Sequence, residues 1–298
     1  MHDHTHNHSE STKNIGIALF LNLAFAIAEI FIGLWTNSLA VLSNSLHDFG
    51  DSFSLGLSLY FDKISKKNKS DVYTYGFKRF SIIPVIINSL ILLSGSLYIL
   101  YEAIVRIITP QTTRADGIIL FALAGMTINL IAYIRLKKGR TLNERAASLH
   151  LLDDVMGLFS VLVVSVIMKY YNVPILDPIL SVMITLFVLS KIFQNLKSAK
   201  LIFLQAIPVD INVRKLGDKL AQIDGVISIH DLHAWSLDGE NHILTVHLVT
   251  KDELSIKQVT SIKCEAKKTI IDAGINHPTI EIETRNELCD LSDCLTIR

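Results

Sequence analysis

The chain has 298 residues, half of them apolar, and its 28 basic residues balance 28 acidic residues to a formal net charge of zero. Its mean hydropathy is positive. A soluble nucleic-acid-binding protein usually carries a basic excess, so this composition argues against that class and favours a membrane protein.

The apolar residues are concentrated in the first two thirds of the chain. Long apolar runs extend to about Phe193, whereas Asn195–Arg298 carries charges throughout, as a soluble domain does. We therefore expect a His-rich tail over 1–12, a transmembrane domain over 13–194 and a soluble domain over 195–298. The three cysteines, Cys264, Cys289 and Cys294, give no even-numbered disulfide framework, which indicates a reducing compartment for the soluble domain.

The tail is the first feature in chain order. Histidines alternate with polar residues at positions His2, His4, His6 and His8. Such a segment cannot build a core and is expected to be disordered. Three interpretations stay open: a solvated tail with no task, a loose collector of Zn²⁺ for a transport path, and an added purification tag. The tag is the weakest of the three, because Asp, Thr and Asn separate the histidines.

Six segments are long and apolar enough to cross a bilayer, since a helical span needs about 20 mostly apolar residues. They are Asn14–Leu34, Leu39–Phe61, Ser81–Tyr101, Gly117–Tyr133, Ala146–Met168 and Ile175–Phe193. All six are expected to be helices, because lipid offers the backbone no hydrogen-bond partners. The first is too long and too weakly flanked for a cleaved signal peptide, so we expect it to be retained.

The loops predict the orientation, because loops rich in Lys and Arg stay in the cytoplasm. Basic residues gather after the second span (Lys63, Lys66, Lys67, Lys69, Lys78 and Arg79) and after the fourth (Arg135, Lys137, Lys138, Arg140 and Arg145). The other loops contain only Arg106, Arg114 and Lys169. We therefore expect a multi-pass protein of the cell membrane, with both termini and the soluble domain in the cytoplasm.

Two of the predicted spans contain ionisable residues at matching spacing. His47 and Asp51 are four residues apart in the second span, as are His150 and Asp154 in the fifth, so each pair lies on one helical face. An Asp at a helix centre costs roughly 2.5–3.5 kcal/mol on insertion, so an unpaired set would threaten insertion. Two imidazoles and two carboxylates form a tetrahedral set suited to Zn²⁺, whereas Mg²⁺ and Ca²⁺ prefer oxygen ligands. The sequence therefore predicts a metal site inside the bilayer.

The simpler alternative is a buried polar network that only locks two helices together. The same His and Asp spacing in two different spans makes this alternative weaker than it would be for a single pair. Asp48 and Asp153 point about 100° away from the neighbouring ligands. They are interpreted as supporting the ligands or contacting other helices, and Asn44 as a candidate outer donor.

The soluble domain is predicted to be a small α+β fold. Helical spacing covers Ile211–Ile223 and Ser255–Ala273, and the predicted strands are Val226–Leu237, His242–Thr250 and Thr279–Glu283.

Four separated motifs stand in order along the chain. They are Thr36–Asp51 (TNSLAVLSNSLHDFGD), Tyr75–Arg79 (YGFKR), His150–Asp154 with Gly157, and His230–Leu237 (HDLHAWSL). Together they resemble the signatures of the cation diffusion facilitator family, in its zinc-preferring branch. The resemblance implies a homodimeric Zn²⁺/H⁺ antiporter with six transmembrane helices and a cytoplasmic ferredoxin-like domain. Cd²⁺ and Co²⁺ are further candidate ions.

The chain departs from relatives at two places. Where many relatives carry Asp three residues before the first His ligand, this chain has Asn44, which leaves the role of that position open. Some relatives hold a separate ion in the loop after the second span. Here that loop, Asp71–Tyr75, has no His, so no site is expected in it.

In the soluble domain, the resemblance suggests that His230, His247 and Glu283 converge on a regulatory Zn²⁺ near the dimer contact. A lone His in a strand is more often a surface or core residue, and this alternative has equal weight. His233 and His277 are weaker candidates. Two terminal cysteines, Cys289 and Cys294, are either a loosely spaced metal pair or two reduced thiols.

These features favour export of a divalent cation through a site that faces each side of the membrane in turn. Ligand His must be neutral and ligand Asp ionised to bind metal, so protons from an acidic exterior would eject the ion. A membrane enzyme is disfavoured, because four side chains fill the coordination sphere and the sequence has no HExxH run. A membrane-anchored metal sensor remains the alternative. The expected partners are a second copy, the lipid bilayer, divalent ions and protons, and no nucleic acid.

Overall fold

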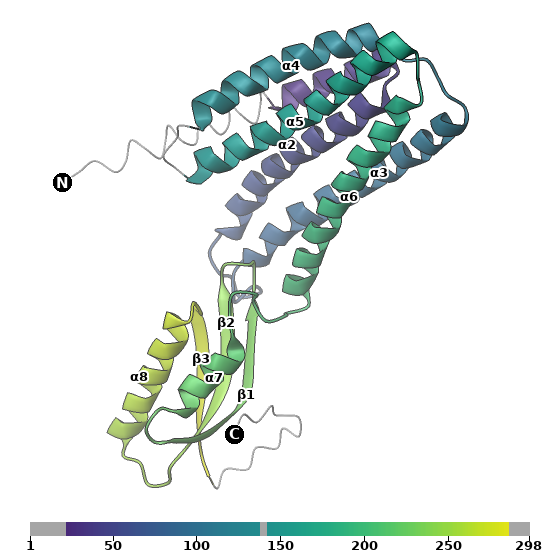
Figure 1. Cartoon of the computed structure of the whole chain (residues 1–298). Helices are drawn as coiled ribbons and strands as arrows, with labels where there is room; N and C mark the ends of the chain where they lie inside the picture. Colours follow the sequence, from purple (N-terminus) through teal and green to yellow (C-terminus); the bar gives the residue numbers. More distant parts are fainter. Residues whose placement is uncertain (1–21, 138–141, 286–298) are drawn as a thin grey trace, which may run out of the picture. The chain divides into compact units, whose positions relative to one another are not determined.

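The computed structural model describes residues 22–137 and 142–285 and divides into two compact units (Figure 1). The first contains the residues up to Phe61 together with Ile83–Leu196, and the second contains Asp62–Ile82 together with the residues from Lys197 onward. The histidines of the predicted tail and the pair Cys289 and Cys294 lie outside the described residues.

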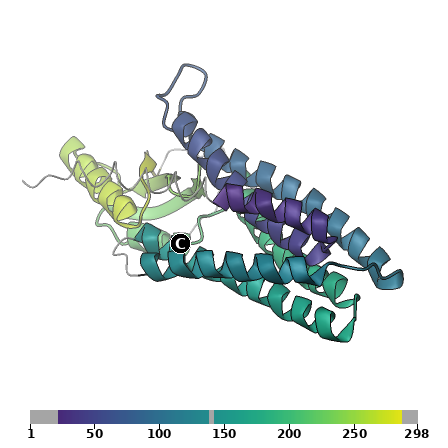
Figure 2. The same cartoon turned by 90° about the horizontal axis from the view of Figure 1, so that it is seen from above.

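The first unit is a bundle of helices that run alongside one another (Figures 1 and 2). Its first helix is described over Asn22–Thr36. The helices that follow in order are α2 (Leu39–Ser65), α3 (Ile83–Ile108), α4 (Ala115–Leu136), α5 (Leu142–Tyr171) and α6 (Leu176–Phe203).

Four helical segments are long and apolar enough to span a membrane: Lys78–Ile108, Ala115–Arg135, Ser148–Tyr171 and Leu176–Phe203. They correspond to the third to sixth predicted spans. Helix α2 has the necessary length, 27 residues, but its polar side chains lower its hydropathy. The first helix, over the residues described, belongs to the shorter apolar helices.

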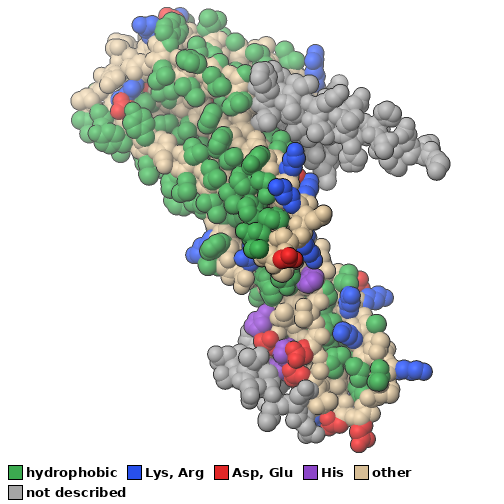
Figure 3. All heavy atoms as spheres, turned by 180° about the vertical axis from the view of Figure 1, so that it is seen from behind, with side chains coloured by type: hydrophobic (Ala, Val, Ile, Leu, Met, Phe, Trp, Pro, Cys, Tyr) green, Lys and Arg blue, Asp and Glu red, His purple; other side chains and the backbone are tan. Residues whose placement is uncertain are grey.

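The outward faces of this bundle carry large apolar side chains. Leu120 is 73 % exposed, and Tyr98, Met183 and Phe187 are each more than half exposed. Figure 3 shows one such face covered by hydrophobic side chains. A soluble protein rarely exposes apolar patches of this extent, so the surface is suited to contact with lipid.

A buried carboxylate fixes the start of α2 against α6. Asp177 accepts the hydroxyl of Ser38 and the backbone N–H groups of Leu39, at 2.7 Å, and Ala40, at 3.4 Å. It therefore caps the N-terminus of α2 from a neighbouring helix, where backbone N–H groups lack partners and negative charge is favourable. His47 lies about 12 Å further along the helix axis.

Close packing also sets the position of α2 against α3. A Cβ atom at Gly50 would lie 2.4 Å from a methyl carbon of Leu92. Only glycine allows the two helices to approach this closely, as small residues do in membrane bundles.

The second unit contains η1 (Lys78–Ile82), α7 (Val213–Ala221), β1 (Val226–Ser236), β2 (His242–Thr250), α8 (Ile256–Asp272) and β3 (His277–Thr284). Strand β2 is central, antiparallel to β1 and parallel to β3. The predicted small α+β domain is confirmed. The order α-β-β-α-β has one strand fewer, among the described residues, than the βαββαβ order of a ferredoxin-like fold.

The core of the second unit lies between the sheet and helices α7 and α8. Leu244, Val246 and Leu248 alternate along β2 and are fully buried in this core. Because successive strand residues point to opposite faces, His247 lies on the other face of the sheet. The strand pairing places His247 opposite both His230 of β1 and Glu281 of β3.

Candidate metal centres

Two groups of predicted ligands define the candidate sites. The bundle group consists of His47, Asp51, His150 and Asp154, and the sheet cluster consists of His230, His247 and Glu283.

Asp51 connects the two helices of the bundle group. Its Oδ2 lies 3.9 Å from Nε2 of His47, one turn away on α2, and 3.6 Å from Nδ1 of His150 on α5. The structure thus brings three of the four residues to one place, with the Asp51 carboxylate between two imidazoles.

Asp154 is buried, with 3 % of its surface exposed. Within the described parts of the chain, its Oδ1 has no hydrogen-bond partner. It lines a cavity of about 280 Å³ between α2, α5 and α6, and His47 lines the same cavity. A buried carboxylate oxygen without a partner is costly, and a cation in the cavity would stabilise it.

A second polar network lies beside this cavity and reaches the first helix. The side-chain amide of Asn44 donates to Glu29 Oε1, at 3.0 Å, and to Asp48 Oδ2, at 3.3 Å. All three side chains are buried. Asn44 therefore joins α2 to the first helix, and Asp48 belongs to the same network.

Gly157 on α5 makes room for this network. A Cβ atom there would lie 2.6 Å from Oδ1 of Asn44, closer than real Cβ contacts allow. The small residue after the second ligand pair is therefore required by the amide of Asn44.

Lys191 on α6 brings a positive charge to the bundle group. Its Nζ lies 3.4 Å from Nε2 of His47 and 3.8 Å from Oδ2 of Asp153. It also lies 4.5 Å from the centroid of the Phe187 ring, within the range of a cation–π contact. Asp153 thus pairs with a residue of α6, and it lines the same cavity as His47 and Asp154.

The interpretation of the sequence missed Lys191 and Glu29. Both are ionisable residues inside predicted spans, where such residues are costly and usually functional. The energetic argument that selects His47 and Asp51 selects these two as well. Neither residue repeats at metal-ligand spacing, so spacing alone does not select it.

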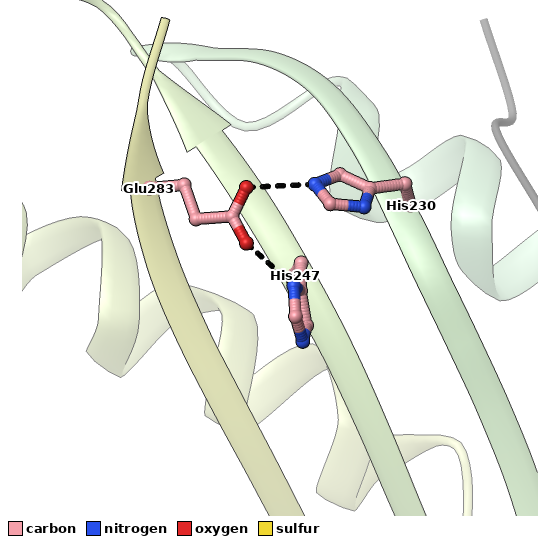
Figure 4. A group of neighbouring side chains, drawn as sticks. All are labelled: His230, His247 and Glu283. Carbon is pink, nitrogen blue, oxygen red and sulfur yellow. Dashed lines mark hydrogen bonds and ion pairs between the residues drawn. The ribbon is translucent and has the colours of Figure 1, made fainter. Parts of the chain in front are cut away.

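The sheet cluster joins one residue from each strand (Figure 4). Nε2 of His230 lies 2.8 Å from Oε2 of Glu283, and Nδ1 of His247 lies 2.5 Å from Oε1. Among the described residues, this is the one group of three His, Cys, Asp or Glu side chains whose ligand atoms all lie within 4.8 Å of one another. The bundle group is more widely spaced.

Two further carboxylates surround the sheet cluster. Nε2 of His247 lies 3.5 Å from Oδ2 of Asp231 and 3.4 Å from Oε2 of Glu281. Asp231 has a positive φ of 51° and occupies an irregularity in the pairing of β1 with β2. Such a bulge re-aims a side chain, so the alternation of a regular strand does not reveal Asp231 as a neighbour of His247.

The weaker candidate histidines occupy different positions. His233 is linked to the cluster through Asp231, whose Oδ1 lies 2.7 Å from its Nε2. His277 lies at the opposite end of β3 from Glu283, where its ring meets that of Tyr75 edge-on at 5.5 Å.

Comparison with known proteins gives matches over both units. Residues 15–204 match a family described as the cation efflux transmembrane domain, and residues 208–285 match the cation efflux protein, cytoplasmic domain. The chain is 33% identical over 287 residues to a cadmium, cobalt and zinc/H(+)-K(+) antiporter of Bacillus velezensis, covering 95% of this chain and 92% of that protein.

Two further relatives have related descriptions. The metal cation efflux system protein CzcD of Cupriavidus metallidurans is 32% identical over 285 residues, which cover 95% of this chain and 89% of the relative. The zinc transporter ZitB of Escherichia coli is 28% identical over 254 residues, which cover 83% of this chain and 81% of the relative.

Proposed function

The chain belongs to the cation efflux, or cation diffusion facilitator, family, and on that premise we propose that it exports Zn²⁺ from the cytoplasm in exchange for protons. Members of this family are transporters of divalent metal cations, and the chain is a multi-pass membrane protein. We further propose that the ion passes through a site formed by the bundle group.

The position of Asp51 carries this proposal. Its carboxylate lies between His47 and His150 inside an apolar bundle, and the buried Asp154 lines a cavity with His47. Two imidazoles and two carboxylates provide the nitrogen and oxygen ligands that Zn²⁺ accepts in tetrahedral sites. The relatives are described as transporting zinc, cadmium and cobalt, so Cd²⁺ and Co²⁺ are proposed as further substrates.

The first helix and α2 would complete a set of six spans with the four apolar helices. In this arrangement the bundle corresponds to residues 13–194 and the domain over 195–298 lies in the cytoplasm. The match of residues 208–285 to a cytoplasmic domain supports this orientation, as do the basic loops. The protein would work as a homodimer with both termini in the cytoplasm.

Protons drive release of the ion. The imidazoles must be neutral and the carboxylates ionised to bind metal, so the site loads where the proton concentration is low. When the helices rock and the site faces an acidic exterior, protons replace the ion on the same atoms. Deprotonation on the cytoplasmic side then restores the ligands.

The sheet cluster is proposed as a regulatory Zn²⁺ site. His230, His247 and Glu283 supply three ligands, and Asp231 and Glu281 stand close enough to His247 to supply further oxygens. The competing interpretation is structural, since Glu283 already accepts a hydrogen bond from each ring. Metal content, measured as described in the Discussion, distinguishes the two.

A membrane-anchored metal sensor is the second candidate function. The observation that favours it is the closer spacing of the ligand atoms in the sheet cluster than in the bundle group. A sensor has no use for buried carboxylates inside the bundle, which is why transport is the preferred proposal.

Flux through sealed vesicles tests the proposal. The purified protein is reconstituted into liposomes that contain a fluorescent Zn²⁺ indicator, and a pH gradient of either sign is imposed. We expect Zn²⁺ to enter when the lumen is more acidic than the bath, because protons that flow out are exchanged for Zn²⁺ that flows in, and this uptake should exceed that of protein-free vesicles. A folded, correctly inserted protein that moves no Zn²⁺, Cd²⁺ or Co²⁺ would leave the sensor as the better function.

A further inference from the structure

We propose that Lys191 is a tethered cation that competes with the transported ion for His47. The inference rests on the proposed transport site and adds a residue that sets the affinity of that site. The Lys191 ammonium would lower the affinity for metal and speed the release of the ion.

The geometry at His47 is the first argument. An ammonium has three donors and no acceptor, so Nε2 of His47 must accept the hydrogen bond from Nζ of Lys191, at 3.4 Å. Acceptance uses the lone pair of Nε2. A metal ion bound through Nε2 needs the same lone pair, so ammonium and metal exclude each other at this atom.

Lys191 also has two contacts other than the one with His47. Oδ2 of Asp153 lies 3.8 Å from Nζ, and the Phe187 ring centroid lies 4.5 Å from it. A flexible four-carbon side chain can leave His47 and stay in contact with the carboxylate and the ring. Displacement by an arriving ion therefore leaves the ammonium paired.

Charge is the third argument. Near the bundle group, Lys191 offsets part of the negative charge of Asp51 and Asp154, and it repels a divalent cation. Both effects weaken the binding of the divalent ion at the bundle group. A transporter has to release its ion on the far side of the membrane, so a lower affinity favours turnover.

Replacing Lys191 by a neutral side chain of similar length tests the inference. We expect Lys191→Met to lower the KM for Zn²⁺ roughly tenfold, because a removed like charge a few ångströms away is worth at least that factor. The maximal rate should also fall, because release becomes slower. Lys191→Arg keeps the charge and should keep KM near the parental value. This split between KM and maximal rate, with rescue by Arg, is not expected from loss of packing alone.

The matched control is Lys197→Met, six residues further along α6, where the lysine is exposed. It should leave both kinetic parameters unchanged. Lys191→Gln is the second neutral variant, for use if the Met variant does not insert. An unchanged or raised KM in the folded neutral variants would overturn the inference.

Failure of the inference on Lys191 can be distinguished from failure of the proposed transport function. If the parent protein moves no metal, the transport proposal fails. If the parent transports and His150→Ala does not, but the neutral Lys191 variants match the parent, only the role of Lys191 fails.

Discussion

Oδ2 of Asp51 on α2 lies 3.6 Å from Nδ1 of His150 on α5, and this contact joins the two helices that carry the proposed transport site. A carboxylate that serves residues on both helices should be the least replaceable member of the bundle group.

We expect His47→Ala, Asp51→Ala, His150→Ala and Asp154→Ala each to abolish Zn²⁺ flux in vesicles while leaving a folded protein. Three ligands cannot complete the tetrahedral site. The control is Ser160→Ala, because Ser160 lines the same cavity and donates its hydroxyl to the carbonyl of Met156 on its own helix. Near-normal flux in any two of the four variants would refute the site.

Changing His47 and His150 together to Asp should shift ion selectivity. Four carboxylates remove the preference of imidazole for Zn²⁺, so Mn²⁺ should gain relative to Zn²⁺ and Cd²⁺. Crowded carboxylates take up protons in a low dielectric, so the gain should be largest at high pH. Fluxes of the three ions are measured in the same vesicles across pH. A Zn²⁺ to Mn²⁺ ratio that equals the parental ratio at every pH would show that the histidines do not set selectivity.

Gly157→Ala should destabilise the bundle by about 1–3 kcal/mol, the usual cost of overpacking a core. The new methyl group would lie 2.6 Å from the amide oxygen of Asn44. Gly56→Ala on α2 is the matched control, because a Cβ atom there meets no described heavy atom within 4 Å. It should leave the stability unchanged or raise it by about 0.5–1 kcal/mol. Thermal unfolding in detergent measures both, and equal melting temperatures would contradict the packing argument.

Asp177→Asn should lower the free energy of unfolding by about 1–3 kcal/mol, because the amide cannot accept all the hydrogen bonds that the start of α2 donates to the carboxylate. Asp116→Asn provides the comparison. Asp116 also lies in the first turn of a helix, but it is exposed and pairs with Lys169 at 2.6 Å. Its replacement should cost little, since exposed ion pairs contribute little. If both variants unfold at the parental temperature, the cap is not important for stability.

The sheet cluster should bind about one Zn²⁺ per chain beyond the ion of the bundle group. His247→Ala and Glu283→Gln should each remove this ion, which elemental analysis of the dialysed full-length protein detects. His277→Ala is the control, since His277 lies at the far end of β3. A metal content that is equal in all these variants would leave the three residues as a hydrogen-bonded network.

Much of the architecture can be predicted from the apolar runs of the sequence and from the spacing of its apolar and polar residues. The third to sixth spans are recognisable as long apolar runs. The strands and helices of the second unit are recognisable because each buries side chains at a regular spacing. The pairs His47 with Asp51 and His150 with Asp154 follow from helical spacing alone.

The remaining features depend on contacts between distant segments. Asp177 reaches the start of α2 across more than 130 residues of sequence, and Asp231 turns toward His247 only because β1 has an irregularity there. Lys191 was within reach of sequence reasoning, as an isolated charge in an apolar span. The contact of Lys191 with His47 could not be predicted from the sequence, since it depends on how α6 packs against α2.

The near contact of Gly157 with Asn44 has an evolutionary consequence. Neither position can change freely, because the volume missing at one is occupied by the amide of the other. Relatives that carry a larger residue at the equivalent of Gly157 should carry a shorter or differently oriented side chain at the equivalent of Asn44. Substitutions at the two positions are therefore expected to be correlated across the family, although the residues lie on different helices and neither belongs to the proposed ligand set.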